Sequence, residues 1–236
     1  MRTSTEQPPY SPPAFWFTLP AGFLEIPLTG APENRLPTFA DALAPLFPDA
    51  TPQQKLSLLR SSEAAARRLL AAGTGYLAGC LFRTDGGGLT TALLAVQLVG
   101  ARCRDRRRFA RSTARQWAGE EAAELEAGVL EVPYGPVALL ASRREVLVPA
   151  AVFGVGHPQV EQVYQLRAGL PLLTHDRAAI LTLTTRDADS WSDYLGVFSH
   201  VLASVSATEP RDGEPSFVTT ATGAVTVRDD VRSVFG

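Results

Sequence analysis

The chain has 236 residues, of which 45% are hydrophobic and 19% are charged, and its formal net charge is −2 at pH 7. This is the composition of a globular protein with enough apolar side chains for a core, in one large domain or at most two small ones. A pI near 6.0 excludes an overall charge that would attract nucleic acid or an anionic membrane, so we expect neither as a partner.

The first thirteen residues, 1–13, are rich in proline and show no apolar periodicity, which predicts a disordered arm. They lack the apolar segment of a secretory signal. The longest apolar stretch, residues 89–99, is too short to span a bilayer. We therefore expect a soluble, cytoplasmic protein.

Two strands and two helices are predicted next. Residues 15–20 form an aromatic and apolar run typical of a strand, and residues 23–28 predict an edge strand, because their proline cannot donate within a sheet. Residues 37–47 carry the apolar side chains of a short helix. A longer helix is predicted to begin at Thr51, which is followed by proline and glutamine as at many helix starts, and to end at Gly73.

A β-hairpin is predicted from residues 74–83 and 89–102, which flank an Asp-Gly-Gly-Gly turn. In that hairpin Cys80 faces a residue near position 92 and lies far from Cys103. We therefore expect two free, buried thiols and no disulfide, which is consistent with a reducing compartment.

Residues 104–127 are predicted to form a helix that Gly128 ends. Short β-like runs then follow one another at hairpin spacing, with Arg143-Arg144 among the predicted turns. These runs are residues 129–134, 137–142, 146–153, 160–166 and 178–185. Sequential strands joined by short turns favour an antiparallel sheet over parallel crossover units.

The last predicted element is an amphipathic helix over residues 191–205. One apolar stripe at the helical period is formed by Trp191, Tyr194, Leu195, Phe198, Val201, Leu202 and Val205. Ser190 and Asp193 have the spacing of a capping box at its start. A strand followed by a helix with such a face predicts a sheet covered by helices, with the aromatic side chains of the stripe buried against the sheet.

The sequence thus predicts three regions: a disordered arm over residues 1–13, a single α+β domain over residues 14–207, and a polar tail over residues 208–236. Within the tail, residues 217–220 and 224–227 could pair as a minor hairpin. The fold expected for the domain is an antiparallel sheet between helices, with extra N-terminal helices.

No catalytic, cofactor-binding or metal-binding residue is predicted. His157, His175 and His200 are scattered and lack the spacing of metal ligands. The common hydrolase and metalloprotease motifs are absent. His175 precedes Asp176, but adjacent residues in a turn do not point at one another, so this pair gives little support for a general base.

A cluster of arginines is the one feature that indicates binding. On a helix, five of them share a side and could grip a phosphate or a carboxylate: Arg104, Arg107, Arg108, Arg111 and Arg115. The alternative is a structural role, in which the arginines pair with Glu120, Glu121 or Glu124, pair with acids elsewhere in the domain, or are simply solvated. The cluster lacks the interleaved aromatic side chains of single-strand nucleic-acid sites, so the expected partner is a protein or an anionic ligand.

Two segments resemble the Mog1/PsbP-like superfamily, and within it the actinobacterial LpqN-like proteins. The first is the Phe-Trp-Phe-Thr-Leu-Pro-Ala-Gly-Phe run of residues 15–23, and the second comprises the runs 160–166 and 180–185 with the helix 191–205. The resemblance implies an α/β/α sandwich used for partner binding and assembly, with no catalytic residues to carry over. LpqN-like proteins with a lipobox are exported, and because this chain lacks a lipobox, the resemblance does not imply the cell envelope.

The leading functional hypothesis is a non-catalytic binding or accessory protein that acts through protein–protein interaction. The alternative is a small-molecule-binding domain or an enzyme whose site is assembled from distant loops. The sequence leaves open the identity of the protein partner and the oligomeric state.

Overall fold

The computed structural model describes residues 15–20, 22–26, 28, 37, 51, 53, 63, 67–83, 89–120, 124–148, 157, 159–173 and 176–207. Its strands are β1 (Phe23–Glu25), β2 (Thr74–Arg83), β3 (Leu89–Gly100), β4 (Glu124–Val132), β5 (Gly135–Val148), β6 (Gln159–Leu172) and β7 (Arg177–Thr185). Its labelled helices are α3 (Arg106–Ala118) and α5 (Trp191–Ala203). The predicted arm and tail lie outside the described residues.

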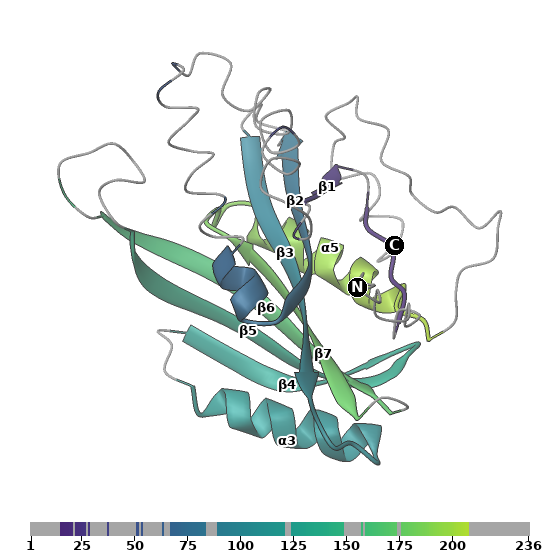
Figure 1. The fold of residues 1–236 in the computed structure, drawn as a ribbon. Coiled ribbons are helices and arrows are strands. Elements are labelled where there is room, and N and C mark those ends of the chain that lie inside the picture. Colours follow the sequence, from purple (N-terminus) through teal and green to yellow (C-terminus); the bar gives the residue numbers. More distant parts are fainter. Residues whose placement is uncertain are drawn as a thin grey trace, which may run out of the picture.

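The seven strands form one antiparallel sheet in the order β1-β2-β3-β7-β6-β5-β4 (Figure 1). Each neighbouring pair is antiparallel, as the short turns between strands predicted. Within the β2–β3 hairpin Cys80 lies opposite Ala92, which confirms the predicted register, and both cysteines are free and buried. The α+β class is therefore confirmed.

The two labelled helices cover opposite faces of the sheet. Side chains of α5 pack in the main core with Leu181 and Leu183 of β7. Trp117 of α3 packs in a second cluster with Ile180 of β7 and Leu140 of β5. Successive side chains of a strand point to opposite faces, so Ile180 lies on the face of α3, and Leu181 lies on that of α5.

Three predicted boundaries were wrong in the middle of the chain. The helix predicted over residues 104–127 ends at Ala118, with Gly119 as its C-cap, and strand β4 already begins at Glu124. The predicted turn at Arg143-Arg144 lies inside β5, which is continuous from Gly135 to Val148. Strand β6 is likewise longer than predicted and runs from Gln159 to Leu172. In each case, pairing with a neighbouring strand overrides the preference of the local sequence for a helix or a turn.

The N-terminal expectations are met in part. Residues 15–20 make a single bridge, between Trp16 and Ser206, where a strand was predicted, and β1 is an edge strand as predicted. Residues 67–71 are helical, and Gly73 has φ +82°, a left-handed conformation that ends helices and favours glycine. Of the helix predicted over residues 37–47, only Pro37 lies within the described residues.

Helix α5 is docked as predicted and has Ser190 as its N-cap residue. Tyr194, Phe198 and Leu202 are buried, while Trp191 is half-buried and Leu195 is exposed. The predicted capping box is wrong, because the Ser190 side chain makes no capping hydrogen bond to the helix backbone.

Candidate functional site

Helix α3 carries the predicted arginine cluster and is fixed to the sheet by its small and aromatic side chains. Ala110, Ala114 and Trp117 are buried beneath it. Asp105 caps its start, where the carboxylate accepts the N–H of Arg108 at 2.7 Å. The close approach of the helix depends on Gly169 of β6, since a Cβ there would lie 3.2 Å from the Trp117 ring.

Two arginines of the first turn of α3 serve the fold. The guanidinium of Arg106 lies over the Tyr134 ring, 4.4 Å from its centroid, and donates a hydrogen bond to the Tyr134 carbonyl. Arg107 pairs with Glu131 of β4, and both side chains are exposed. Arg107, one of the five predicted binding residues, is thus paired with an acid of its own chain in this structure.

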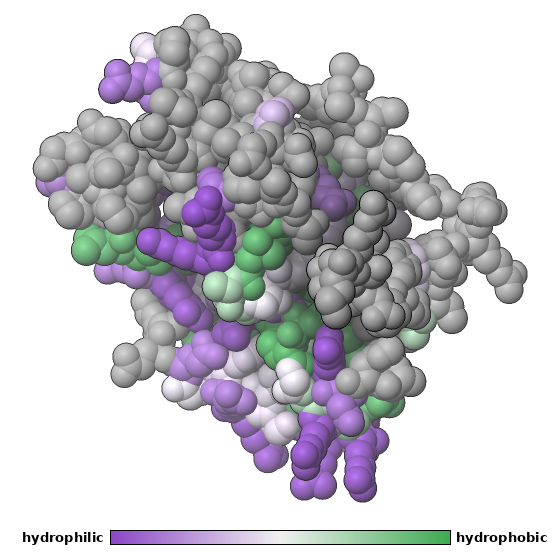
Figure 2. All heavy atoms as spheres, in the orientation of Figure 1, coloured by the Kyte–Doolittle hydropathy of each residue, from purple (hydrophilic) through white to green (hydrophobic). Residues whose placement is uncertain are grey.

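The outer face of α3 presents Arg108, Arg111 and Arg115, which we call the outer arginine stripe. All three are exposed, whereas Ala110 and Ala114, on the side of the helix that packs on the sheet, are buried. None makes an ion pair with another residue of the described ranges. Figure 2 shows hydrophilic side chains along the lower edge of the molecule, over α3.

The other residues of the predicted cluster are placed differently. Arg104 precedes the helix and is exposed, so it lies beside the stripe rather than on it. Glu120, one of the acids named as possible partners, pairs with arginines outside the stripe. Glu121 lies outside the described residues, and Glu124 is the first residue of β4.

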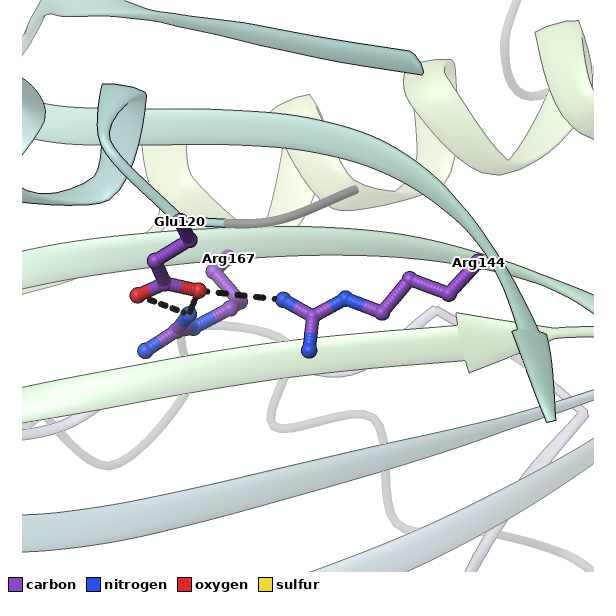
Figure 3. Close-up of polar contacts among 3 residues, drawn as sticks. All are labelled: Glu120, Arg144 and Arg167. Atoms are coloured by element: carbon purple, nitrogen blue, oxygen red, sulfur yellow. Dashed lines mark hydrogen bonds and ion pairs between the residues drawn. The ribbon is translucent and has the colours of Figure 1, made fainter. Parts of the chain in front are cut away.

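Glu120 instead forms a cluster with two arginines of the sheet, which we call the Glu120 cluster: Glu120, Arg144 and Arg167. One guanidinium nitrogen of Arg167 lies 3.0 and 2.9 Å from the two carboxylate oxygens of Glu120, and Arg144 donates to one of those oxygens at 3.1 Å. Figure 3 shows both guanidinium groups turned toward the same carboxylate. One carboxylate facing two guanidinium groups leaves a surplus positive charge.

The Glu120 cluster is partly open to solvent and leaves buried polar groups unused. The side chains of Arg144, Arg167 and Glu120 are 35%, 22% and 31% exposed. Arg167 also lies over the Trp117 ring, 4.6 Å from its centroid, which fixes its position. Beneath the cluster, Arg144 Nε and Ser142 Oγ are buried and have no hydrogen-bond partner in the described part of the chain.

Sequence reasoning missed this cluster, since Arg144 was assigned to a turn. The available signal was alternation within the strands. Arg144 and Arg167 each stand on the face of a strand whose neighbouring positions hold Leu140, Ala138 and Gly169. A charged residue on such a face requires a partner, but the partner's identity depends on where α3 ends.

The thiol of Cys80 is unsuited to nucleophilic chemistry. Burial raises the pKa of the Cys80 thiol to about 12, an effect partly offset by its hydrogen bonds, including one to Tyr194. The thiol is therefore protonated at neutral pH. Burial also raises the pKa of the Tyr194 hydroxyl, which bonds to Thr90 at 2.9 Å.

Two of the three histidines lie within the described residues. His157 is exposed, His200 is half-buried in α5, and His175 lies outside the described residues. No group of three or more metal-binding side chains occurs among the described residues.

Within the described ranges, every helix is too short or too polar to cross a membrane. Comparison with known proteins finds no matching family model, no matching curated protein and no matching solved structure.

Proposed function

We propose that the protein is a non-catalytic binding or accessory protein that recognises an acidic surface of a partner protein through the outer arginine stripe. One observation carries the proposal: Arg108, Arg111 and Arg115 are exposed on one helix face without an ion-pair partner in the described structure. Guanidinium groups in a row suit recognition of carboxylates, because each offers a fixed fork of N–H donors.

The helix macrodipole accounts for Arg115, which stands in the last turn of α3, but not for the other two arginines of the stripe. The first turn of α3 contains arginines and no acidic residue, so its charge opposes the helix macrodipole. Arg108 and Arg111 therefore do not stabilise the helix through its dipole. In α3 the aromatic side chains are buried or half-buried, so the stripe offers no stacking surface for bases, and we expect no nucleic-acid partner.

We also propose that the fold is the Mog1/PsbP-like sandwich with additional N-terminal helices. The antiparallel sheet with α3 and α5 on opposite faces supports this assignment, as does the contact of residues 15–20 with the chain after α5. The helical residues 67–71 fit the added N-terminal material. Two free, buried thiols support a cytoplasmic location.

The experiment is affinity capture from a lysate of the native organism, comparing three forms of the protein. The first is the wild type, the second is Arg108→Glu with Arg111→Glu, and the third is Arg68→Glu with Arg177→Glu. The third is a matched control, because Arg68 and Arg177 are exposed arginines that do not belong to α3. Melting temperature and circular dichroism establish that all three forms are folded.

We expect the stripe variant to lose the partner that the wild type and the control variant retain. Capture by the wild type should also weaken as salt rises from 0.05 to 0.5 M, since exposed charges are screened over about 10 Å at 0.1 M salt. Equal capture by all three forms, or no specific capture by the wild type, would contradict the proposal.

A further inference from the structure

The Glu120 cluster lies on a sheet face that is polar around its two arginines. Antiparallel register places Ser142 of β5 opposite Gln165 of β6, between Arg144 and Arg167. Thr184 and Thr182 of β7 lie beside Gln165 and Arg167 on the same face. Hydroxyl, amide and guanidinium groups thus stand at neighbouring positions on this part of the sheet.

The two arginines are anchored far apart on the sheet, and their guanidinium groups contact the same carboxylate of Glu120. Arg144 lies opposite Val163, whereas Arg167 lies opposite Leu140, four positions away along the strands. Four positions correspond to about 13 Å between the backbone anchors. Figure 3 shows the Arg144 side chain running along the sheet toward Glu120. Without Glu120, the two guanidinium groups would repel each other, and the Arg144 side chain would move away from Arg167, which its contact with the Trp117 ring holds in place.

We propose that this face binds a small dicarboxylate, with one ligand carboxylate on Arg144 and the other on Arg167, and that Glu120 occupies the site until the ligand displaces it. Glu120 comes directly after the C-cap Gly119, and its backbone N–H donates to the Trp117 carbonyl at 2.9 Å, so its side chain can turn away while its backbone still closes the helix. This site is separate from the outer arginine stripe and does not depend on the proposed protein partner.

The two positive charges of the site and the distance between the two arginines favour a dicarboxylate ligand. A monocarboxylate can only replace Glu120 one for one, and the tethered Glu120 has the advantage of a high effective concentration. A dicarboxylate can give each guanidinium group a carboxylate of its own, whereas phosphate, like Glu120, would have to serve both arginines with one compact group. The ligand also approaches the hydroxyl group of Ser142. This residue is 4% exposed, and its Oγ has no hydrogen-bond partner in the described part of the chain.

The test measures ligand affinity in the full chain by isothermal titration and by the fluorescence of Trp117, in a background where Trp16 and Trp191 are replaced by Phe. Trp117 reports on the site because Arg167 stacks on its ring. The probes are succinate, glutarate and adipate, with acetate and inorganic phosphate for comparison. The key variant is Glu120→Gln, which removes the competing carboxylate.

We expect Glu120→Gln to bind at least one of the dicarboxylates about tenfold more tightly than the wild type and more tightly than acetate or phosphate. The matched control is Glu131→Gln, which frees Arg107 alone and should give no gain. Adding either Arg144→Gln or Arg167→Gln to Glu120→Gln should lower the affinity about tenfold or more. Two separate arginine variants keep the test valid if one of them fails to fold.

Three outcomes would overturn the inference. One is a folded Glu120→Gln variant that binds no dicarboxylate more tightly than the wild type does. Another is phosphate binding more tightly than every dicarboxylate, which would reject the ligand class. The third is an equal gain in Glu131→Gln, which would mean that any released arginine attracts these anions.

Discussion

At the scale of single residues, Asp187 shows how the turn before α5 is held. Its carboxylate accepts hydrogen bonds from the backbone N–H groups of Asp189 and Ser190, at 3.0 and 3.3 Å, and from the Ser190 hydroxyl at 2.8 Å. Burial acts to raise the pKa of Asp187, but these bonds and one from Thr90 outweigh it and lower the pKa below its ordinary value near 3.8.

This lowered pKa predicts an acid-sensitive contribution to stability. A carboxyl with a depressed folded-state pKa stabilises the fold above its unfolded-state pKa, and the contribution is lost as pH falls through the folded value. Asp187→Asn should therefore lower the free energy of unfolding by about 1 kcal/mol at pH 7 and by less at pH 3. Urea unfolding at both pH values measures this, with the exposed Asp189→Asn as control. An equal loss at both pH values would show that the Asp187 charge does not matter.

At the scale of elements, α5 is the principal cover of the main core. Phe198 is 2% exposed and packs in the main core with Leu181 and Leu183, whereas Leu195 on the same helix is 39% exposed. Leu195 and Phe198 are about one turn apart, so the difference in their burial marks the edge of the docked face of the helix.

Phe198→Ala should lower the free energy of unfolding by about 3–5 kcal/mol, because a buried aromatic ring is lost and a cavity remains. Leu195→Ala is the matched control and should cost about 0.5 kcal/mol or less, as surface substitutions usually do. Denaturant titration measures both. A Phe198→Ala protein that unfolds at the wild-type midpoint would mean that α5 is not docked.

The same scale shows how far the sequence predicts this fold. Helix α5 and the β2–β3 hairpin were predictable because their apolar period and glycine turn are local signals. The end of α3 was not, because residues 119–127 contain good helix formers and only pairing with β5 makes Glu124–Val132 a strand. Arg143-Arg144 resembled a turn for the same reason, although both residues pair with β6.

The outer arginine stripe was predictable from the sequence, whereas the Glu120 cluster was not. The helical period correctly places Arg108, Arg111 and Arg115 together, since it is a property of one element. The Glu120 cluster unites the end of α3 with β5 and β6, so it depends on the register between strands. No spacing in the sequence encodes that register, because residue 120 is 24 and 47 positions from its two partners.

At the scale of the whole molecule, one strand pair joins two halves of the sheet. Strands β1 to β3 form one meander and β4 to β7 another, and only β3 and β7 connect them in the sheet order. Helix α5 contacts both halves, since Tyr194 bonds to Thr90 of β3 and the Trp191 ring lies 5.4 Å from that of Tyr164 on β6.

Because both halves share β3–β7 and α5, they should unfold together. Cys80 reports on the first half, since its buried thiol with a pKa near 12 should not react with alkylating agents in the folded state. Trp117 reports on the second half. We expect the urea midpoint of pulsed Cys80 alkylation, in a Cys103→Ser background, to coincide with that of Trp117 fluorescence. Two midpoints would show that the halves are independent units.

The β3–β7 pairing also has a consequence for synthesis on the ribosome. Gly100 of β3 is paired with Arg177 of β7, so 77 residues separate even the nearest partners across this joint. At 5–20 residues per second, β3 waits about 4–15 s with one edge unpaired. During that interval the nascent chain exposes an edge rich in leucine and valine, which is the stage at which a chaperone would protect it best.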